Sequence, residues 1–487
     1  MVGTSTIHPS INPPLPRIQT QAPTTEQPSN TGRAPTEHSS VLPTSMALTR
    51  REAELVNETI PALRQHGEHI STVFYKSMLR DHPELNNYFN SVNMHTGRQP
   101  RALTALILAF ASNIVNISEL TPKLERVAQK HASLAIHPEH YEIVAKYLIR
   151  AFSAVLGPAM TSEVNVAWTK AYWLMAKMLT GREAIIYKQF ANWPDWRPFS
   201  IAKKTPETIE GDIVSFTLVP VDGKPLPSFK PGQYVTVRLK IKGHKYRQLR
   251  QYSLSDAPHP ESYRITVKRD IGASEDAKHD PRQFGSLDEG PPMSSAASSA
   301  SDSSIGSVRP HRPGLVSNTL IDDFEVGDSV ELTHPAGEFF LDAEDPNTSP
   351  VVLISAGAGA APLYPMLKVV SQQGNGRPVS WIQASRHDAP FRERVEKIAK
   401  TDPNVRVKFF RSRLADGDVI SLTSRFQEDF CGLNWEDLWL YNSLAHYYVC
   451  GPEKFMNEIG SHLQKNGVAP SRIQFELYSV GSFEMKK

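Results

Sequence analysis

The sequence predicts a multi-domain protein with three folded domains of different class: an all-helical domain, a small antiparallel β-barrel, and an α/β domain with a parallel sheet. Three changes of pattern along the chain lead to this prediction. Apolar residues recur at helical spacing up to Tyr187, alternate with polar residues from Ile213, and form short runs separated by helical segments from Val351. In addition, a chain of 487 residues is too long for one hydrophobic core.

Helical sequence follows an N-terminal tail. Residues 1–45 are rich in Pro, Ser and Thr and lack a hydrophobic period, so we expect this tail to be disordered. Folded sequence begins with a capping box, in which Thr49 accepts from the amide of Glu52 and Glu52 reaches back. Apolar stripes such as the one at 103–114 then predict a helical domain over 46–192, with the size of a globin or a helical bundle.

The barrel and the α/β domain follow in that order. Three runs that alternate apolar and polar side chains lie at residues 213–219, 234–239 and 263–267. Their Pro-Gly turns predict an antiparallel barrel over 193–348, interrupted at 273–313 by a serine-rich insertion that we do not expect to fold. In 349–487, apolar runs such as VVLIS, VSWIQ and HYYVC predict buried parallel strands.

Charge and cysteine content exclude several classes of function. Lys and Arg number 53 against 51 Asp and Glu, so no one-signed surface for nucleic acid or anionic membrane is expected. Two cysteines cannot form a multi-cysteine metal cluster, and they suit a reducing compartment. No run approaches the roughly 18 apolar residues of a membrane span. We expect a cytoplasmic monomer that acts on small molecules, with mitochondrial import as an alternative that the prolines of the tail disfavour.

One histidine stands on an apolar helix face. His131 is in register with Leu124, Val127, Ala128 and Leu134, which suits a ligand of a buried metal, although such a histidine is more often a core residue. Three segments around it are AQKHASLAIHPEHY, VFYKSMLRDHPELNNYFN and WTKAYWLMAKMLTGREAIIY. Together they closely resemble the globin domain of flavohaemoglobins.

This resemblance implies a haem b site. By it, His131 is the proximal iron ligand, and Tyr141 and Glu183 hydrogen-bond its other ring nitrogen, which makes the imidazole more basic. Tyr75 is implied to be the distal hydrogen-bond donor, for which an ordinary helix tyrosine is the alternative. The remaining implied pocket residues are Phe89, Gln99, Leu103 and, near the haem edge, Lys130.

Two details of the haem site stay open at this point. Proline fits only the first helical turn, so Pro100 leaves the direction of the preceding Gln99 uncertain. For Lys130, a solvated surface lysine is the alternative.

The second domain carries KPGQY followed by RQYSL, which resembles the ferredoxin-reductase superfamily. The resemblance implies that Arg250 pairs with the phosphates of FAD, Tyr252 packs on the flavin ring and Ser253 hydrogen-bonds near its reactive nitrogen. Taken alone, RQYSL also fits an amphipathic strand. Further FAD contacts implied are Tyr234, Gln251 and, in the segment GLVSNTL, Val316, Ser317 and Asn318.

In the third domain, SAGAGAAP lies between an apolar strand and a helix, a context that lets glycine amides and a helix N-terminus face a pyrophosphate. Taken alone, Gly357 and Gly359 also fit a tight turn without a ligand. The resemblance implies an NAD(P)H site made by Gly357, Ala358, Gly359, Ala360, Ala361, Pro362, Cys450, Gly451 and Pro452, with Glu476 and Tyr478 beside the flavin. Ala360 and Ala361 depart from the polar residue and threonine usual in the family, and a buried structural role is the alternative for Cys450.

The strand VSWIQA is followed by two residues that bear on coenzyme choice. Ser385 and Arg386 stand where related reductases discriminate the adenosine ribose, and an arginine there pairs with a 2′-phosphate. We therefore expect NADPH to be used at least as well as NADH.

The resemblance as a whole implies a nitric oxide dioxygenase. Hydride passes from NAD(P)H to FAD, single electrons pass on to the haem, and nitric oxide and O2 combine there to nitrate. Two alternatives stay open: a globin-coupled oxygen or redox sensor, and a general NAD(P)H flavin reductase. Nitric-oxide-driven NAD(P)H consumption would separate the first from a dioxygenase, and the activity of a haem-free variant would separate the second.

Overall fold

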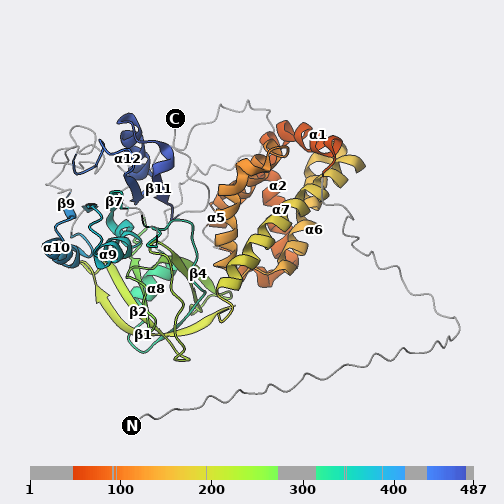
Figure 1. Ribbon diagram of the computed structural model, residues 1–487. Helices are drawn as coiled ribbons and strands as arrows, with labels where there is room; N and C mark the ends of the chain where they lie inside the picture. Colours follow the sequence, from red (N-terminus) through yellow and green to blue (C-terminus); the bar gives the residue numbers. More distant parts are fainter. Residues whose placement is uncertain are drawn as a thin grey trace, which may run out of the picture. The chain divides into compact units, whose positions relative to one another are not determined.

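The computed structural model describes residues 48–89, 93–94, 96–193, 195–272, 314–344, 346, 348–385, 388–411 and 436–478. The tail at 1–45, the insertion at 273–313 and Arg386 lie outside the described residues, so the expectations for them remain predictions. A helical part, an antiparallel sheet and a parallel sheet with helices follow one another along the chain (Figure 1). None of the described helices is both long and apolar enough to cross a membrane.

The helical part contains the capping box that the sequence predicts. Thr49 Oγ1 accepts from the amide of Glu52 at 3.2 Å, and a Glu52 carboxylate oxygen accepts from the amide of Thr49 at 2.8 Å. The helices are α1 (Arg50–Glu58), α2 (Ile60–Asp81), α4 (Arg98–Ser112), α5 (Thr121–Ala132), α6 (Pro138–Leu156) and α7 (Ser162–Gln189). Short 3-10 turns are η1 (Pro83–Asn87), η2 (Ile117–Leu120) and η3 (Gly157–Ala159).

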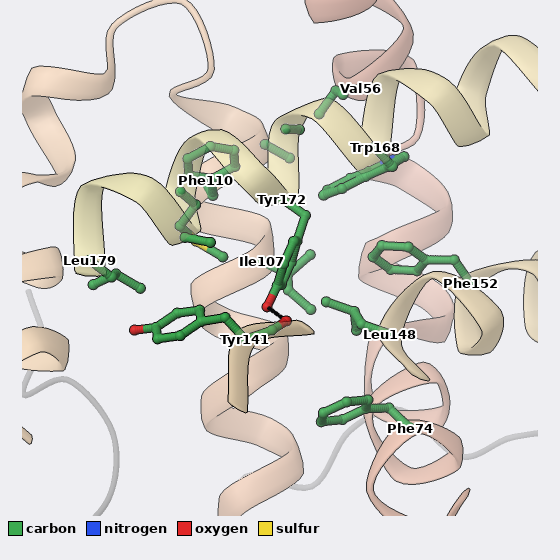
Figure 2. Packing of buried hydrophobic residues seen from close by; sticks show 14 of the residues in the cluster. Val56, Phe74, Ile107, Phe110, Tyr141, Leu148, Phe152, Trp168, Tyr172 and Leu179 are labelled. Atoms are coloured by element: carbon green, nitrogen blue, oxygen red, sulfur yellow. Dashed lines mark hydrogen bonds between the residues drawn. The ribbon is translucent and has the colours of Figure 1, made fainter. Parts of the chain in front are cut away.

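Aromatic side chains fill the core between these helices (Figure 2). Phe152 of α6 is fully buried, and its ring centroid lies 4.8 Å from that of Trp168 on α7. The hydroxyl of Tyr172 donates to the carbonyl oxygen of Tyr141 at 2.6 Å, so the polar end of this ring is satisfied inside the core. The stripe predicted at 103–114 packs against this core, with Ile107 and Phe110 of α4 buried in it.

The middle part is an antiparallel sheet that curls into a barrel. Its strands are β1 (Arg197–Pro206), β2 (Ile213–Pro220), β3 (Tyr234–Leu239), β4 (Gln248–Ser253), β5 (Tyr263–Lys268) and β6 (Ser329–Leu332). Among the described residues the order is β4-β3-β6-β1-β2-β5. An isolated bridge between Leu254 and Ile265 brings the two edges together, and α8 (Leu315–Asp323) packs on the same core.

The last part is an α/β sandwich. Its parallel strands are β7 (Val351–Ala356), β8 (Val379–Ser385), β9 (Val405–Arg411), β10 (His446–Cys450) and β11 (Ile473–Glu476), in the described order β11-β10-β7-β8-β9. The connecting elements are η5 (Gly357–Ala360), α9 (Leu363–Gln373), α10 (Arg392–Thr401), α12 (Glu453–Lys465) and η6 (Pro470–Arg472). Leu353 faces one core with α9, and Val352 faces another with α12, as a strand with period two requires. The predicted fold class is confirmed.

We expect Phe152→Ala to lower the free energy of unfolding of the helical part by about 3 to 5 kcal/mol, because it removes a fully buried ring and leaves a cavity. Val166→Ala on α7 is the control, since Val166 is 49% exposed and should cost less than about 0.5 kcal/mol. Urea unfolding followed by circular dichroism at 222 nm measures both. Equal losses in the two variants would contradict this account of the core.

Candidate functional site

His131 lies in the last turn of α5, where two polar groups from other helices meet its ring. Its Nδ1 is 2.9 Å from Glu183 Oε1 of α7 and 2.8 Å from the hydroxyl of Tyr141 in the first turn of α6. Tyr141 itself donates to Glu183 Oε1 at 2.5 Å. The structure therefore brings together the three residues that the resemblance grouped.

The hydrogen bonds of this cluster fix the tautomer of His131. Burial and the neighbouring Glu183 raise the pKa of Tyr141, so its phenol stays protonated and donates to the carboxylate. Glu183, only 2% exposed, is then an acceptor for the Nδ1–H of His131. A neutral imidazole protonated on Nδ1 carries its lone pair on Nε2, which is the form that ligates a metal.

A second tyrosine lies in the same helical part. Burial raises the pKa of Tyr75 on α2 to about 12, so its hydroxyl is a hydrogen-bond donor at neutral pH. Gln99 Nε2 donates to this hydroxyl at 3.1 Å. The ring of Phe89 lies edge-on to the ring of Tyr75, with 5.4 Å between the two ring centroids. Pro100 occupies the first turn of α4, and this geometry directs Gln99 toward Tyr75. Leu103, one turn later, is half-buried against the core.

Strand β4 carries the residues expected to hold FAD. The hydroxyls of Tyr252 and Ser253 are buried and have no hydrogen-bond partner in the described part of the chain. Burial lowers the pKa of Arg250, whose Nη1 donates to the carbonyl of Leu249 at 2.7 Å. Tyr234 of β3 is buried and pairs with Ser253 across the sheet. This strand thus presents buried polar groups that a bound ligand could satisfy.

Helix α5 contacts the same strand directly. Lys130 Nζ, one residue before His131, donates to Gln251 Oε1, and Gln251 Nε2 donates to Ser133 Oγ at 2.7 Å. The Thr333 hydroxyl donates to the carbonyl of Ser133 at 2.9 Å, and the amide of Gly337 donates to Gln129 Oε1 at 2.9 Å. Sequence reasoning missed these contacts of Gln129 and Ser133, although both residues lie within two positions of His131.

The segment GLVSNTL forms helix α8, with Gly314 as its N-cap. Val316 is buried and Ser317 lies in the first turn, where backbone amides lack helical partners. The backbone amide of Asn318 donates to Gly314 O at 3.2 Å, and the Asn318 side chain makes two hydrogen bonds with the backbone of Asp270.

The glycine turn of the α/β part is a 3-10 turn between β7 and α9. A Cβ placed on Gly359 would lie 2.1 Å from the carbonyl oxygen of Cys450, so only glycine allows this approach. Ala360 and Ala361 are buried in the core beside α9 and add no polar group to the turn. Pro362 is the N-cap of α9.

Cys450 ends strand β10 and is fully buried, which raises the pKa of its thiol. Gly451 and the α12 N-cap Pro452 follow it. The Tyr478 hydroxyl, two residues after the end of β11, donates to the carbonyl of Ala358 in the glycine turn at 3.3 Å.

Two serine hydroxyls lie at the carboxyl ends of β7 and β8, where α/β sheets bind ligands. Ser355 and Ser385 are both buried, and their Oγ atoms have no partner among the described residues. Sequence reasoning missed Ser355, which ends an apolar run two positions before Gly357, the first residue of the glycine turn. The coenzyme preference inferred from Arg386 remains a prediction.

Glu476 ends strand β11 and is 8% exposed. Burial and the nearby Glu338 raise its pKa to about 8, which keeps the carboxyl largely protonated at neutral pH. Glu338 itself pairs with Arg126 of α5 at 2.7 Å, a pair that no sequence motif indicates. A protonated carboxyl can both donate and accept a hydrogen bond.

We expect Gly359→Ala to weaken pyridine-dinucleotide binding roughly tenfold, because overpacking against the backbone of Cys450 costs about 1 to 3 kcal/mol and displaces the turn. Titration of the purified protein with NADH and NADPH gives the dissociation constants. Gly181→Ala in α7 is the control, since nothing lies within 4 Å of a Cβ there. Unchanged binding by the Gly359 variant would remove this turn from the dinucleotide site.

Two protein families match the chain. The globin family matches residues 72–179, and the oxidoreductase NAD-binding domain family matches residues 353–460. The crystal structure of a flavohemoglobin from Malassezia yamatoensis with bound FAD and heme superposes with a TM-score of 0.67 and 26% sequence identity. The superposition covers 89% of this chain and 100% of the Malassezia chain.

Whole-length relatives agree with these matches. A flavohemoprotein from Oceanobacillus iheyensis is 36% identical over 445 residues, which cover 89% of this chain and 97% of the relative. A flavohemoprotein from Rhizobium meliloti is 35% identical over 446 residues, which cover 90% of this chain and 99% of the relative. The chain therefore belongs to the flavohemoprotein family of oxidoreductases.

Proposed function

We propose that this oxidoreductase is a nitric oxide dioxygenase, which uses O2 to oxidise nitric oxide to nitrate at a haem re-reduced by NAD(P)H through FAD. The observation that carries the proposal is the contact between α5 and β4. Lys130 and Ser133 flank His131 and both bond to Gln251, which lies between Arg250 and Tyr252. A haem ligand and a flavin strand in direct contact suit electron transfer between two cofactors.

The chain's residues fit both cofactors. The unpaired hydroxyls of Tyr252 and Ser253 suit a flavin, and the Nδ1-protonated His131 suits an iron ligated through Nε2. The similar Malassezia protein contains both FAD and heme. When bound, the haem iron supplies the site for O2 and nitric oxide, FAD divides a two-electron hydride into single electrons, and NAD(P)H supplies that hydride.

The chain's own groups then have distinct tasks. Glu183 holds the Nδ1 proton of His131 and so increases the basicity of the ring. Tyr75 supplies a hydrogen-bond donor in a buried pocket, and Gln99 orients its hydroxyl by donating to it. Tyr252 and Ser253 orient the flavin, while the turn containing Gly359 accepts the dinucleotide.

We expect His131→Ala to lose stable haem while it keeps FAD, because the ligand and the flavin strand belong to different cores. Pigment analysis and the Soret band of the purified protein measure both cofactors. His82→Ala is a matched control, since the His82 side chain is 30% exposed against 31% for His131 and bonds only to a surface carboxylate in the contacts described. Normal haem stoichiometry in His131→Ala would refute the ligand assignment.

We expect Tyr75→Phe to release O2 roughly ten to a hundred times faster, because a hydrogen bond to a charged acceptor contributes about 1.5 to 3 kcal/mol. Nitrate formation at limiting O2 should fall, while NAD(P)H-driven reduction of an artificial flavin acceptor stays near normal. Flash photolysis and nitrate assays on one preparation measure the two effects.

Tyr147→Phe is the control for this experiment, since the Tyr147 hydroxyl bonds to Asp81 instead. If O2 release and nitrate yield of Tyr75→Phe both match wild type, Tyr75 is a packing residue and the distal role must be withdrawn. If nitric oxide fails to drive NAD(P)H consumption in the wild-type protein, the dioxygenase function itself is wrong.

A further inference from the structure

An ion pair links the flavin strand to the first helix after the glycine turn. Asp256 lies three residues beyond Ser253 of β4, and its Oδ1 accepts from Lys368 Nζ of α9 at 2.6 Å. The two side chains are 32% and 31% exposed, so water screens the pair only in part. This pair belongs to none of the cofactor contacts described above.

Arg264 of β5 holds the carboxylate of this pair from the other side. Its guanidinium is 3.6 Å from Asp256 Oδ2 and donates through Nε to the carbonyl of Ser255 at 3.1 Å. Burial alone would raise the pKa of Asp256, but the two cations, Arg264 and Lys368, lower it, so the carboxylate stays ionised. The loop that leaves the flavin strand is thus fixed at two consecutive residues.

The same guanidinium also packs on the α/β part. It lies 5.2 Å from the ring centroids of both Tyr364 on α9 and Phe391 before α10, and these two rings stack at 5.0 Å with an interplanar angle of 18°. A cation over two stacked rings adds attraction that does not depend on ionic strength as strongly as an exposed pair does. Asp256, Arg264 and Lys368, called the Asp256 cluster below, therefore join the barrel to α9.

A second ion pair connects the α/β part to the barrel, through α10, the helix that follows α9 along the chain. Arg394 of α10 pairs at 3.0 Å with Glu207, which follows β1 and whose side chain is 5% exposed. With two points of attachment on neighbouring helices, rotation of the α/β part about either single contact is restricted.

The Asp256 cluster lies close in the chain to both the glycine turn and strand β4, so a shift of the cluster moves both. Lys368 lies six residues after Pro362, which is roughly 9 Å along α9 at 1.5 Å per residue, and α9 begins where the glycine turn ends. A rigid helix transfers any displacement of Lys368 to that turn. Asp256 is similarly separated from Ser253 by only two residues.

We propose that the Asp256–Lys368 pair, supported by Arg264, is a positioning pair that sets the distance between the nicotinamide and the flavin for hydride transfer. This inference rests on the proposed function, since it assigns the glycine turn to NAD(P)H and strand β4 to FAD. Hydride transfer depends steeply on the approach of the reacting atoms, and a misplacement of about 1 Å can cost roughly a hundredfold in rate. An ion pair whose side chains are 31% and 32% exposed, in contrast, contributes little to folding stability.

The test measures anaerobic FAD reduction by NADH and by NADPH in a stopped-flow instrument. We expect Asp256→Asn and Lys368→Met each to slow the reduction step about tenfold, while the dissociation constants of the dinucleotides change less than about threefold. The double variant should be no slower than the slower single variant, because both remove one interaction. Asp342→Asn is the control, since Asp342 accepts from Lys230 at 2.9 Å in a more exposed pair, with side chains 47% and 49% exposed, and neither residue lies on α9.

A second readout does not depend on activity. In the full-length protein with FAD and haem bound, we expect amide hydrogen exchange in 363–373 to be faster in Asp256→Asn than in Asp342→Asn, because α9 has lost its ion pair with the barrel. Equal reduction rates in wild type and Asp256→Asn, or equal exchange of α9 in the two variants, would overturn the positioning role alone. If neither dinucleotide reduces the flavin of the wild-type protein, the proposed function fails and the positioning role fails with it.

Discussion

The C-terminal end of helix α5 contacts both the helical core and strand β4, and the rest of the site depends on this double contact. One face carries His131 toward Tyr141 and Glu183, while Lys130 and the following Ser133 bond to Gln251 of strand β4. The 3.6-residue period allows neighbouring residues to point to different surfaces. Any shift of α5 relative to β4 would therefore break hydrogen bonds on the barrel side or move the histidine away from its carboxylate partner.

Buried polar groups recur at every point where a cofactor is proposed to bind. The Tyr141–Glu183–His131 cluster satisfies its own groups and so fixes one tautomer, whereas the hydroxyls of Tyr252 and Ser253 lack partners among the described residues. Leaving such groups unpaired costs free energy, since a buried donor or acceptor loses its water without compensation. The first arrangement is complete on the Nδ1 side of His131 without a ligand, whereas the second offers hydroxyls that a ligand could satisfy.

The glycine turn illustrates how backbone contact replaces side-chain chemistry. Ala360 and Ala361 add no polar group there, and they instead bury their methyl groups in the core beside α9. The close approach of Gly359 to the Cys450 carbonyl fixes the turn against β10, and the Asp256 cluster fixes the helix that follows. The location of this turn is consequently set by packing and by an ion pair, and its conformation by glycine.

Local patterns in the sequence determined the class of each part, because helical and strand periods and the capping box at Thr49 depend on residues close together in the chain. The resemblance also grouped His131, Tyr141 and Glu183, and the structure places their polar atoms within 3 Å of one another. Contacts between distant segments were not readable in this way. Gln129 with Gly337, Arg126 with Glu338, and Asp256 with Lys368 are each separated by more than 100 residues and carry no motif. The direction of Gln99 and the bonds of Asn318 were likewise decided by tertiary structure, since a side chain takes the partner that packing brings within reach.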